Sequence, residues 1–170
     1  MKLKTHLQKL LTQHNCSKSV IRHSAAVADR ALEIAKNFSV PIDATLVFTG
    51  AMLHDIGRGE THGLEHFISS ARIVRKEGFS EDVARIVERH IGAGITAEEA
   101  GALGLPPQDY IAETPEEIVV SYADNLTSGT KRLTFDEART RFVKRLGSSH
   151  PALSRLDAQH RQIHGWSKKS

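Results

Sequence analysis

The sequence predicts an all-α protein with a single domain, and three observations lead to that prediction. Apolar residues recur at three- and four-residue steps along most of the chain, and helix-capping signals are repeated. No stretch alternates apolar and polar residues between hairpin turns. With 170 residues, 39% of them hydrophobic, the chain is long enough to bury one core without disulfides. We expect one helical bundle over residues 1–170 and essentially no sheet.

The composition excludes several kinds of protein. The single cysteine, Cys16, rules out an internal disulfide and a cysteine-based zinc site. No apolar run approaches the roughly 18 residues of a membrane span, and the N-terminus lacks a signal-type apolar segment, so we expect a cytoplasmic protein with no membrane partner. A net charge of +3 favours anionic ligands but does not by itself indicate nucleic acid, which stays open as a partner.

The first three predicted helices cover residues 3–13, 17–38 and 44–55. Pro41 separates the second from the third, and Asp43 supplies an acidic start for the third helix. The first helix is amphipathic, and its apolar stripe consists of Leu3, Leu7, Leu10 and Leu11. The third is apolar nearly all round, which is typical of a buried helix.

The middle of the chain predicts two further helices and a loop. Gly78 closes a helix over residues 64–77, and Ser80 opens another that runs to about His90. Residues 101–114, rich in glycine and proline, form a loop. Capping-box patterns occur at Thr96–Glu99, Thr114–Glu117 and Thr134–Glu137.

The last part predicts three helices. Pro115 to about Leu126 is apolar on most sides and carries Asp124 near its end. Phe135–Leu146 and Pro151 to about Trp166 are polar. We interpret the basic residues of these two helices as a solvated outer face rather than a nucleic-acid patch; they include Arg139, Arg141, Lys144, Arg145 and Arg155.

The segment Leu53-His54-Asp55-Ile56-Gly57 places two good metal ligands side by side at the end of the buried helix. Adjacent helical residues point about 100° apart, so the pair can converge on one ion only near a helix terminus. We expect Gly57 to end the helix in the left-handed conformation. For an isolated His-Asp pair a structural role is the simpler interpretation, so the metal hypothesis depends on further ligands.

Further ligands are present. His23 lies on the second helix and Asp124 near the end of another, while His66 opens one helix and His90 ends the next. Imidazoles with carboxylates form a mixed nitrogen and oxygen set that suits iron, manganese, cobalt, nickel or zinc, and sometimes magnesium. Ten histidines in the chain make such ligands abundant.

With these residues the chain resembles the HD superfamily of metal-dependent phosphohydrolases, in its HDIG subgroup, over roughly residues 17–130. His23, His54, Asp55 and Asp124 match the four positions that name the superfamily. The sequence around Gly104-Leu105-Pro106 is similar to that of small stand-alone archaeal members of the family. The resemblance implies an HD-type helical bundle, with residues 17–130 as its core and an extension at each end.

The resemblance also implies a metal centre of one ion, or of two. His66 and His90 match the histidines of members with a second metal, although Arg89 stands where some of those members have another histidine. A metal held by the four signature residues would lower the pKa of a water molecule and polarise a phosphate. Asp55 and His54 are then the catalytic candidates, and Asp55 is the expected bridge between two ions.

Basic residues near the signature are candidates for binding the phosphate. Arg58 follows the signature directly and is the first choice by proximity. The other candidates are Arg22 and Lys18 near His23, Lys131 and Arg132 after Asp124, and His62 as a residue on the substrate side.

The predicted function is hydrolysis of a phosphomonoester or phosphodiester, in a nucleotide or small phosphorylated metabolite. Two alternatives stay open. One is a non-catalytic nucleotide-binding or RNA-associated module that keeps the metal site. The other is oxygen chemistry at a di-iron centre, since similar ligands support it. The substrate, the metal and the oligomeric state are not determined by the sequence.

Overall fold

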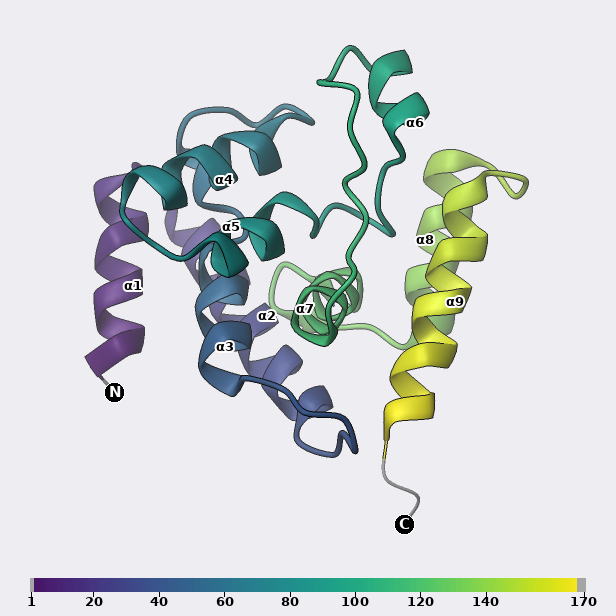
Figure 1. Ribbon diagram of the computed structural model, residues 1–170, viewed down its shortest axis with the longest axis horizontal. Coiled ribbons are helices and arrows are strands. Elements are labelled where there is room, and N and C mark those ends of the chain that lie inside the picture. The colour runs from purple at the N-terminus through teal and green to yellow at the C-terminus, as the bar shows by residue number, and fades with distance from the viewer. Residues whose placement is uncertain (1, 168–170) are drawn as a thin grey trace.

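The structure, a computed structural model that describes residues 2–167, is built almost entirely of helices (Figure 1). This confirms the all-α prediction. The elements in chain order are α1 Lys2–Gln13, α2 Lys18–Ala35, α3 Ala44–Leu53, the 3-10 helix η1 Ile56–Gly59, α4 His66–Lys76, α5 Glu81–Glu88, α6 Ala97–Ala102, α7 Pro115–Asn125, the strands β1 Thr127–Ser128 and β2 Lys131–Arg132, α8 Phe135–Leu146 and α9 Pro151–Trp166. Among the described residues, no helix is both long and apolar enough to cross a membrane.

Helices α2, α3, α5 and α7 pack against one another around the main apolar core, with α1 against α3 and α4 against α5. Helix α3 lies in the middle of this body. Its side chains Val47, Met52 and Leu53 have no exposed surface, as its uniformly apolar sequence predicts. Burying each such side chain contributes about 1.5–3 kcal/mol, so the end of α3 is held in a fixed place.

Helices α8 and α9 form a hairpin beside this body, on the far side of α7 from α3 (Figure 1). Three contacts hold α9 in place. The Tyr122 hydroxyl of α7 lies 2.5 Å from Nδ1 of His160, the Arg155 guanidinium donates to Gly94 O at 3.1 Å, and the ring of Trp166 packs edge-on against Phe38. The hairpin is therefore a fixed wall of the molecule.

Two of the three predicted capping boxes are confirmed, at Thr96–Glu99 and at Thr134–Glu137. The third is wrong in part. The Thr114 hydroxyl accepts from Glu117 N, but the Glu117 carboxylate accepts from Glu113 N and from Arg89 instead of from the N-cap nitrogen. An ion pair with Arg89 competes for that carboxylate, and a local pattern does not contain this partner.

Other boundaries also differ from the predictions. Helix α2 ends at Ala35, because Phe38 leaves the helix to bridge the backbone of Ser167. Leu3 is 38% exposed, so the buried stripe of α1 begins only at Leu7. A short antiparallel hairpin pairs Thr127 with Arg132, where no sheet was predicted; two-residue strands are too short to produce an alternating pattern.

Gly57 is needed for a reason other than the predicted one. Among the described glycines with positive φ is Gly78, which ends α4 as predicted, but Gly57 is not one of them. Gly57 lies in η1 against the start of α4, where an added Cβ would lie 2.2 Å from His66 O and 2.6 Å from Ser70 N. Its N–H donates to the Ser70 hydroxyl at 2.9 Å. The glycine therefore allows close packing, and the chain leaves the α-helix at Asp55, whose φ of −102° and ψ of 14° are not helical.

We predict that Gly57→Ala lowers the free energy of unfolding by about 1–3 kcal/mol, because the methyl group meets backbone atoms that cannot move away cheaply. The matched control is Gly165→Ala in α9, where an added Cβ meets no heavy atom within 4 Å. That control should leave stability unchanged or raise it by up to about 1 kcal/mol. Urea denaturation of both variants in EDTA measures the difference; equal effects would contradict this account of Gly57.

Candidate metal centre

Asp55 and His54 emerge from the fixed end of α3. His54 is the C-cap of that helix, with helical φ and ψ, while the backbone of Asp55 already turns into η1. This change of direction between two successive residues brings both side chains to one side. His54 has no exposed surface and Asp55 is 4% exposed, so the pair faces the interior.

Six side chains converge here: His23, His66 and Asp124 from α2, α4 and α7, His54 and Asp55 from the α3–η1 junction, and His90 from the segment that follows α5. Three sets of ligand atoms lie within 4.8 Å of one another: His23 with His54 and Asp55, His54 with His90 and Asp124, and Asp55 with His66 and His90. The imidazole rings form a row, with centroid separations of 5.3 Å from His23 to His54, 4.8 Å from His54 to His90 and 5.4 Å from His90 to His66. The structure thus brings together every residue that the sequence nominated as a metal ligand.

The two oxygens of Asp55 face different members of this group. Oδ1 lies 3.1 Å from His66 Nε2 and 3.7 Å from His90 Nε2, whereas Oδ2 lies 3.6 Å from His54 Nε2. On the other side of His54, Asp124 Oδ1 lies 3.6 Å from His54 Nε2 and 3.0 Å from His23 Nε2. Asp55 therefore occupies the position between two ligand sets.

Every histidine of the row is oriented by a backbone carbonyl. The Nδ1 atoms donate to Gly129 O from His23 at 2.8 Å, to Ala51 O from His54 at 2.7 Å, to Gly63 O from His66 at 3.0 Å and to Val87 O from His90 at 2.7 Å. A carbonyl oxygen only accepts, so the proton resides on Nδ1. In the neutral ring, Nε2 then presents its lone pair to the centre, which is the arrangement that metal-binding histidines require.

The charges of the site call for a cation. Burial by itself would lower the pKa of His54, but the carboxylates of Asp55 and Asp124 outweigh burial and raise that pKa to about 9. Burial and the neighbouring charge of His54 lower the pKa of His90 to about 3, so His90 is neutral. Burial opposes ionisation of Asp55 and Asp124 as well, yet the surrounding imidazoles hold the pKa of both carboxyls below its usual value. The buried carboxylate of Asp55 and the partly buried carboxylate of Asp124 thus attract positive charge to the place where the Nε2 atoms point.

Buried polar atoms without hydrogen-bond partners are a further sign that the site fits a transition metal. His54 Nε2, Asp55 Oδ1 and His66 Nε2 are buried and have no hydrogen-bond partner among the described residues. Leaving three such atoms unpaired in one place costs about 1–3 kcal/mol each. An ion coordinated by them removes that cost, and the mixed imidazole and carboxylate set suits iron, manganese, cobalt, nickel or zinc.

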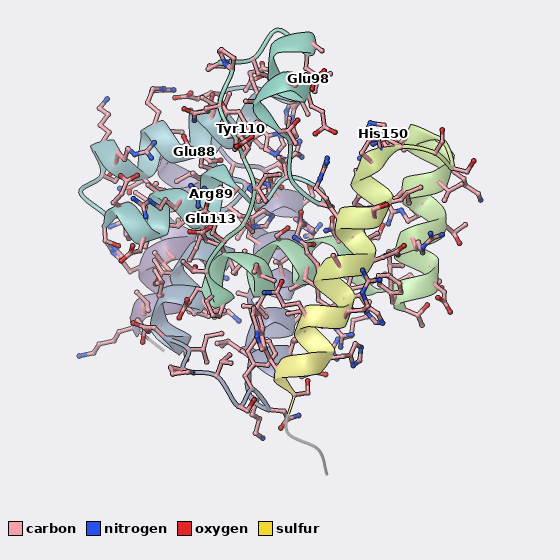
Figure 2. All side chains as sticks on the ribbon, turned by 45° about the vertical axis from the view of Figure 1, so that its right-hand side comes forward. Glu88, Arg89, Glu98, Tyr110, Glu113 and His150 are labelled. Atoms are coloured by element: carbon pink, nitrogen blue, oxygen red, sulfur yellow. The ribbon has the colours of Figure 1, made fainter. Side chains whose placement is uncertain are left out.

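Arg89 stands where some relatives have a second histidine, and in this structure it forms ion pairs. Its Nη1 lies 2.9 Å from Glu113 Oε2 and 3.0 Å from Glu117 Oε2. Figure 2 labels Arg89 and Glu113, which lie next to each other in the view. Glu117 is buried at the start of α7. The ion pairs tie the end of α5, and with it His90, to the helix that carries Asp124.

The centre opens into a cavity of about 630 Å³. His23, Arg58, His66, His90 and Asp124 line one part of it. Arg58 is also ion-paired, since its Nε lies 2.8 Å from Asp55 Oδ2. The opposite wall comes from α6 and from the α8–α9 hairpin, and its polar side chains are Glu99, Arg141, Arg145, His150 and Arg155.

Arg141 and Arg145 are exposed, as the predicted solvated face requires, but together with the partly buried Arg155 they also line this cavity, which the prediction did not include. Periodicity identifies the polar face of a helix but not what lies opposite it. The carbonyl of Gly129, which orients His23, was also missed. No side-chain signal marks it, because every residue has a carbonyl.

Of the six phosphate-binding candidates, only Arg58 lies in the cavity. Lys18, Arg22 and His62 are exposed and do not line it. Lys131 pairs with Glu137 and Arg132 pairs with Glu33, both on the surface. Proximity in sequence to a ligand does not set the direction of a long side chain, so for these five residues the structure offers no contact with the centre.

Fold and site together define a helical domain built around a cluster of histidines and aspartates that could hold a metal ion. The family model of the HD domain matches residues 20–129, and the chain belongs to that family. The matched range agrees with the resemblance over residues 17–130 and leaves out α1, α8 and α9.

The chain is also similar in sequence to two archaeal proteins and in fold to a solved HD domain. The chain is 51% identical to an uncharacterised protein of Methanocaldococcus jannaschii, over 83% of this chain and 85% of that protein. It is 45% identical to a tRNA (cytidine(56)-2'-O)-methyltransferase of Thermoplasma volcanium, where the match covers 80% of this chain but only 40% of the relative. The HD domain of the L. monocytogenes phosphodiesterase PgpH, solved in complex with cyclic-di-AMP, has the same fold, with a TM-score of 0.53, 16% identity and coverage of 94% and 96% of the two chains.

We predict that a saturating divalent transition metal raises the melting temperature of the EDTA-treated protein by about 5–10 °C, which corresponds to a ligand at 100 times its Kd. Asp55→Asn should lose most of this rise, because it keeps the shape but removes the central negative charge. His6→Gln, on the exposed face of α1, should keep the whole rise. Differential scanning calorimetry with Mn²⁺ and with Zn²⁺ measures it, and an unchanged rise in Asp55→Asn would contradict the proposed centre.

Proposed function

We propose that this protein is a metal-dependent phosphohydrolase that cleaves a phosphomonoester or phosphodiester bond of a nucleotide or small phosphorylated metabolite. One observation carries the proposal: six preoriented ligands with three unpaired buried atoms lie at one part of a 630 Å³ cavity. Membership of the HD family supports the hydrolase class. Placement within the HDIG subgroup and in the cytoplasm are predictions that accompany the proposal.

The roles proposed for the chain's residues follow from their contacts. His23, His54, Asp55 and Asp124 would hold one ion, which when bound activates water and polarises the phosphate. His66 and His90 would complete a second position on the other side of Asp55, whose two oxygens face both sets. The carbonyl contacts at Nδ1 keep all four imidazoles in the ligating tautomer, so no reorganisation is needed when the substrate arrives.

Arg58 is the residue proposed to connect the centre with the substrate. It lines the cavity and contacts Asp55 at the same time. A guanidinium keeps several donors, so one can hold the carboxylate while others face an anion in the cavity. Arg58 would thus fix the orientation of Asp55 and neutralise part of the charge of a bound phosphate.

Hydrolysis is tested with bis(p-nitrophenyl) phosphate, p-nitrophenyl phosphate and a panel of nucleotides. We expect turnover that EDTA abolishes and added metal restores. Asp124→Asn should lower kcat/KM by about 100-fold or more, since a metal contributes several kcal/mol to the transition state. The control His6→Gln should retain full activity. A metal-loaded, folded protein that cleaves none of these compounds would refute the proposal.

A second candidate, supported by the tRNA methyltransferase relatives, is an RNA-associated module that binds a nucleotide without turnover. In those relatives the matched region is 40% and 44% of the protein, so a domain of this kind is joined there to a further part. This candidate predicts metal-dependent nucleotide binding with no product over hours. The hydrolysis panel separates the two functions.

A further inference from the structure

The wall of the cavity opposite the candidate metal centre carries three arginines from outside the region matched by the family model, Arg141, Arg145 and Arg155. Arg141 and Arg145 lie four residues apart in α8, on one face of that helix, and both line the cavity. His150, at the start of α9, lines it as well, and Figure 2 shows it at the end of the hairpin nearest α6. This wall therefore contributes positive charge to the same space as the metal ligands.

Within the described part of the chain, Arg141 and Arg145 have no hydrogen bond or ion pair. This sets them apart from most other arginines. On the same hairpin, Arg139 pairs with Asp157 at 2.8 Å and Arg155 pairs with Glu99 at 2.8 Å. Two unpaired guanidiniums on one wall of a cavity are available to a ligand.

The remaining charges of the cavity are already matched. Arg58 pairs with Asp55, Glu99 pairs with Arg155, and Asp124 belongs to the metal centre. The positive charge of Arg141 and Arg145 is therefore not neutralised by any side chain that lines the cavity. An anion is the ligand that complements it, and a guanidinium pair suits a phosphate in particular.

An apolar surface leads from the metal centre to these arginines. Ile91 and Gly92 follow His90 and line the cavity, and a Cβ on Gly92 would lie 3.7 Å from the ring of Phe142. Phe142 in turn adjoins Arg141 in α8. Three of the four large apolar side chains that the described chain exposes also line this cavity, namely Leu64 at 39%, Leu103 at 54% and Leu146 at 38%. Exposed apolar groups gathered in one place indicate a binding surface for an apolar or aromatic body.

The hairpin is held firmly enough for the two anionic positions to keep a fixed separation. Arg155 donates to Ala93 O at 3.3 Å and to Gly94 O at 3.1 Å, in the segment that follows His90. The Gln159 amide of α9 donates to Ser121 Oγ of α7 at 3.4 Å. These contacts hold α9 against the body of the molecule, and the ion pair of Arg139 with Asp157 at 2.8 Å joins α8, which carries Arg141 and Arg145, to α9.

We propose that the cavity binds a phosphate–nucleoside–phosphate unit, with one phosphate at the metal centre, the nucleoside along the apolar surface and the second phosphate on Arg141 and Arg145. The first of these positions rests on the proposed function. A nucleoside monophosphate leaves the arginines empty. A nucleoside triphosphate keeps its phosphates together, with no apolar body between them. A nucleoside 3',5'-bisphosphate has the required order, both as a free molecule and as the end unit of an oligonucleotide.

Equilibrium binding to the Mn²⁺-loaded protein tests the proposal. Isothermal titration with adenosine 3',5'-bisphosphate and with adenosine 5'-monophosphate gives the ratio of the two affinities, and chromatography afterwards checks that the nucleotide is intact. We expect the bisphosphate to bind at least about tenfold more tightly than the monophosphate. Its second phosphate can form charge-assisted hydrogen bonds with Arg141 and Arg145, and such bonds are stronger than hydrogen bonds between neutral groups. Where the nucleotide is cleaved, the ratio of KM values replaces the ratio of Kd values.

The matched variants are R141Q/R145Q and K144Q/R161Q. Both remove two positive charges from the hairpin, and Lys144 and Arg161 are exposed and do not line the cavity. R141Q/R145Q should bring the affinity ratio down to about one, whereas K144Q/R161Q should keep it. Circular dichroism and thermal melting of both variants confirm the fold.

An affinity ratio near one in the unaltered protein, or an equal loss in both double variants, would overturn the proposal. A 5'-phosphorylated trinucleotide distinguishes the two possible ligands, a free nucleoside 3',5'-bisphosphate and the end of an oligonucleotide strand. Binding more than tenfold tighter than the bisphosphate identifies a strand end, and equal or weaker binding identifies the free bisphosphate. If no phosphate ester is hydrolysed, the proposed function fails, while the affinity ratio still decides this binding site.

Discussion

The structure depends on one electrostatic constraint: two carboxylates lie among imidazoles, that of Asp55 buried and that of Asp124 partly buried at the edge of the cavity. Burying a carboxylate is costly unless a positive partner stands beside it. The cation-attracting character of the site, seen in the raised pKa of His54, follows from that cost. A bound metal ion satisfies the same constraint with a fixed charge, and it uses the lone pairs that would otherwise be unpaired.

The surrounding helices serve to keep this arrangement in place. Each ligating histidine is held by a carbonyl from its own neighbourhood or from a turn far away in sequence, as Gly129 O holds His23. Gly57 lets η1 approach α4 so closely that Asp55 and His66 meet. Arg89 joins α5 to α7 through Glu117, which positions His90 relative to Asp124. None of these residues is a ligand, yet the position of each ligand depends on them.

The hairpin of α8 and α9 adds what the matched HD region does not contain. The metal ligands lie within residues 20–129, whereas the arginines on the opposite wall lie beyond that range. If the proposed function holds, a centre that activates phosphate esters is combined here with a second wall of different chemistry. On that proposal, the choice of substrate would reside in this wall and the hydrolysis in the centre formed by the matched HD region.

The sequence by itself determined the helices, most of their caps and which six residues are candidate ligands. Helix period, capping residues and ligand types are local properties that three or four neighbouring residues express, as the Thr134 box and the bounds of α8 illustrate. Only the tertiary structure decided the direction in which the long side chains point and the groups that they contact. Arg132 follows Asp124 closely in sequence but pairs with Glu33, whereas Arg141 is more distant in sequence and lines the cavity. The same holds for Gly57, whose close approach to His66 O arises from packing between elements. Such contacts join residues far apart in the chain, and no local pattern records them.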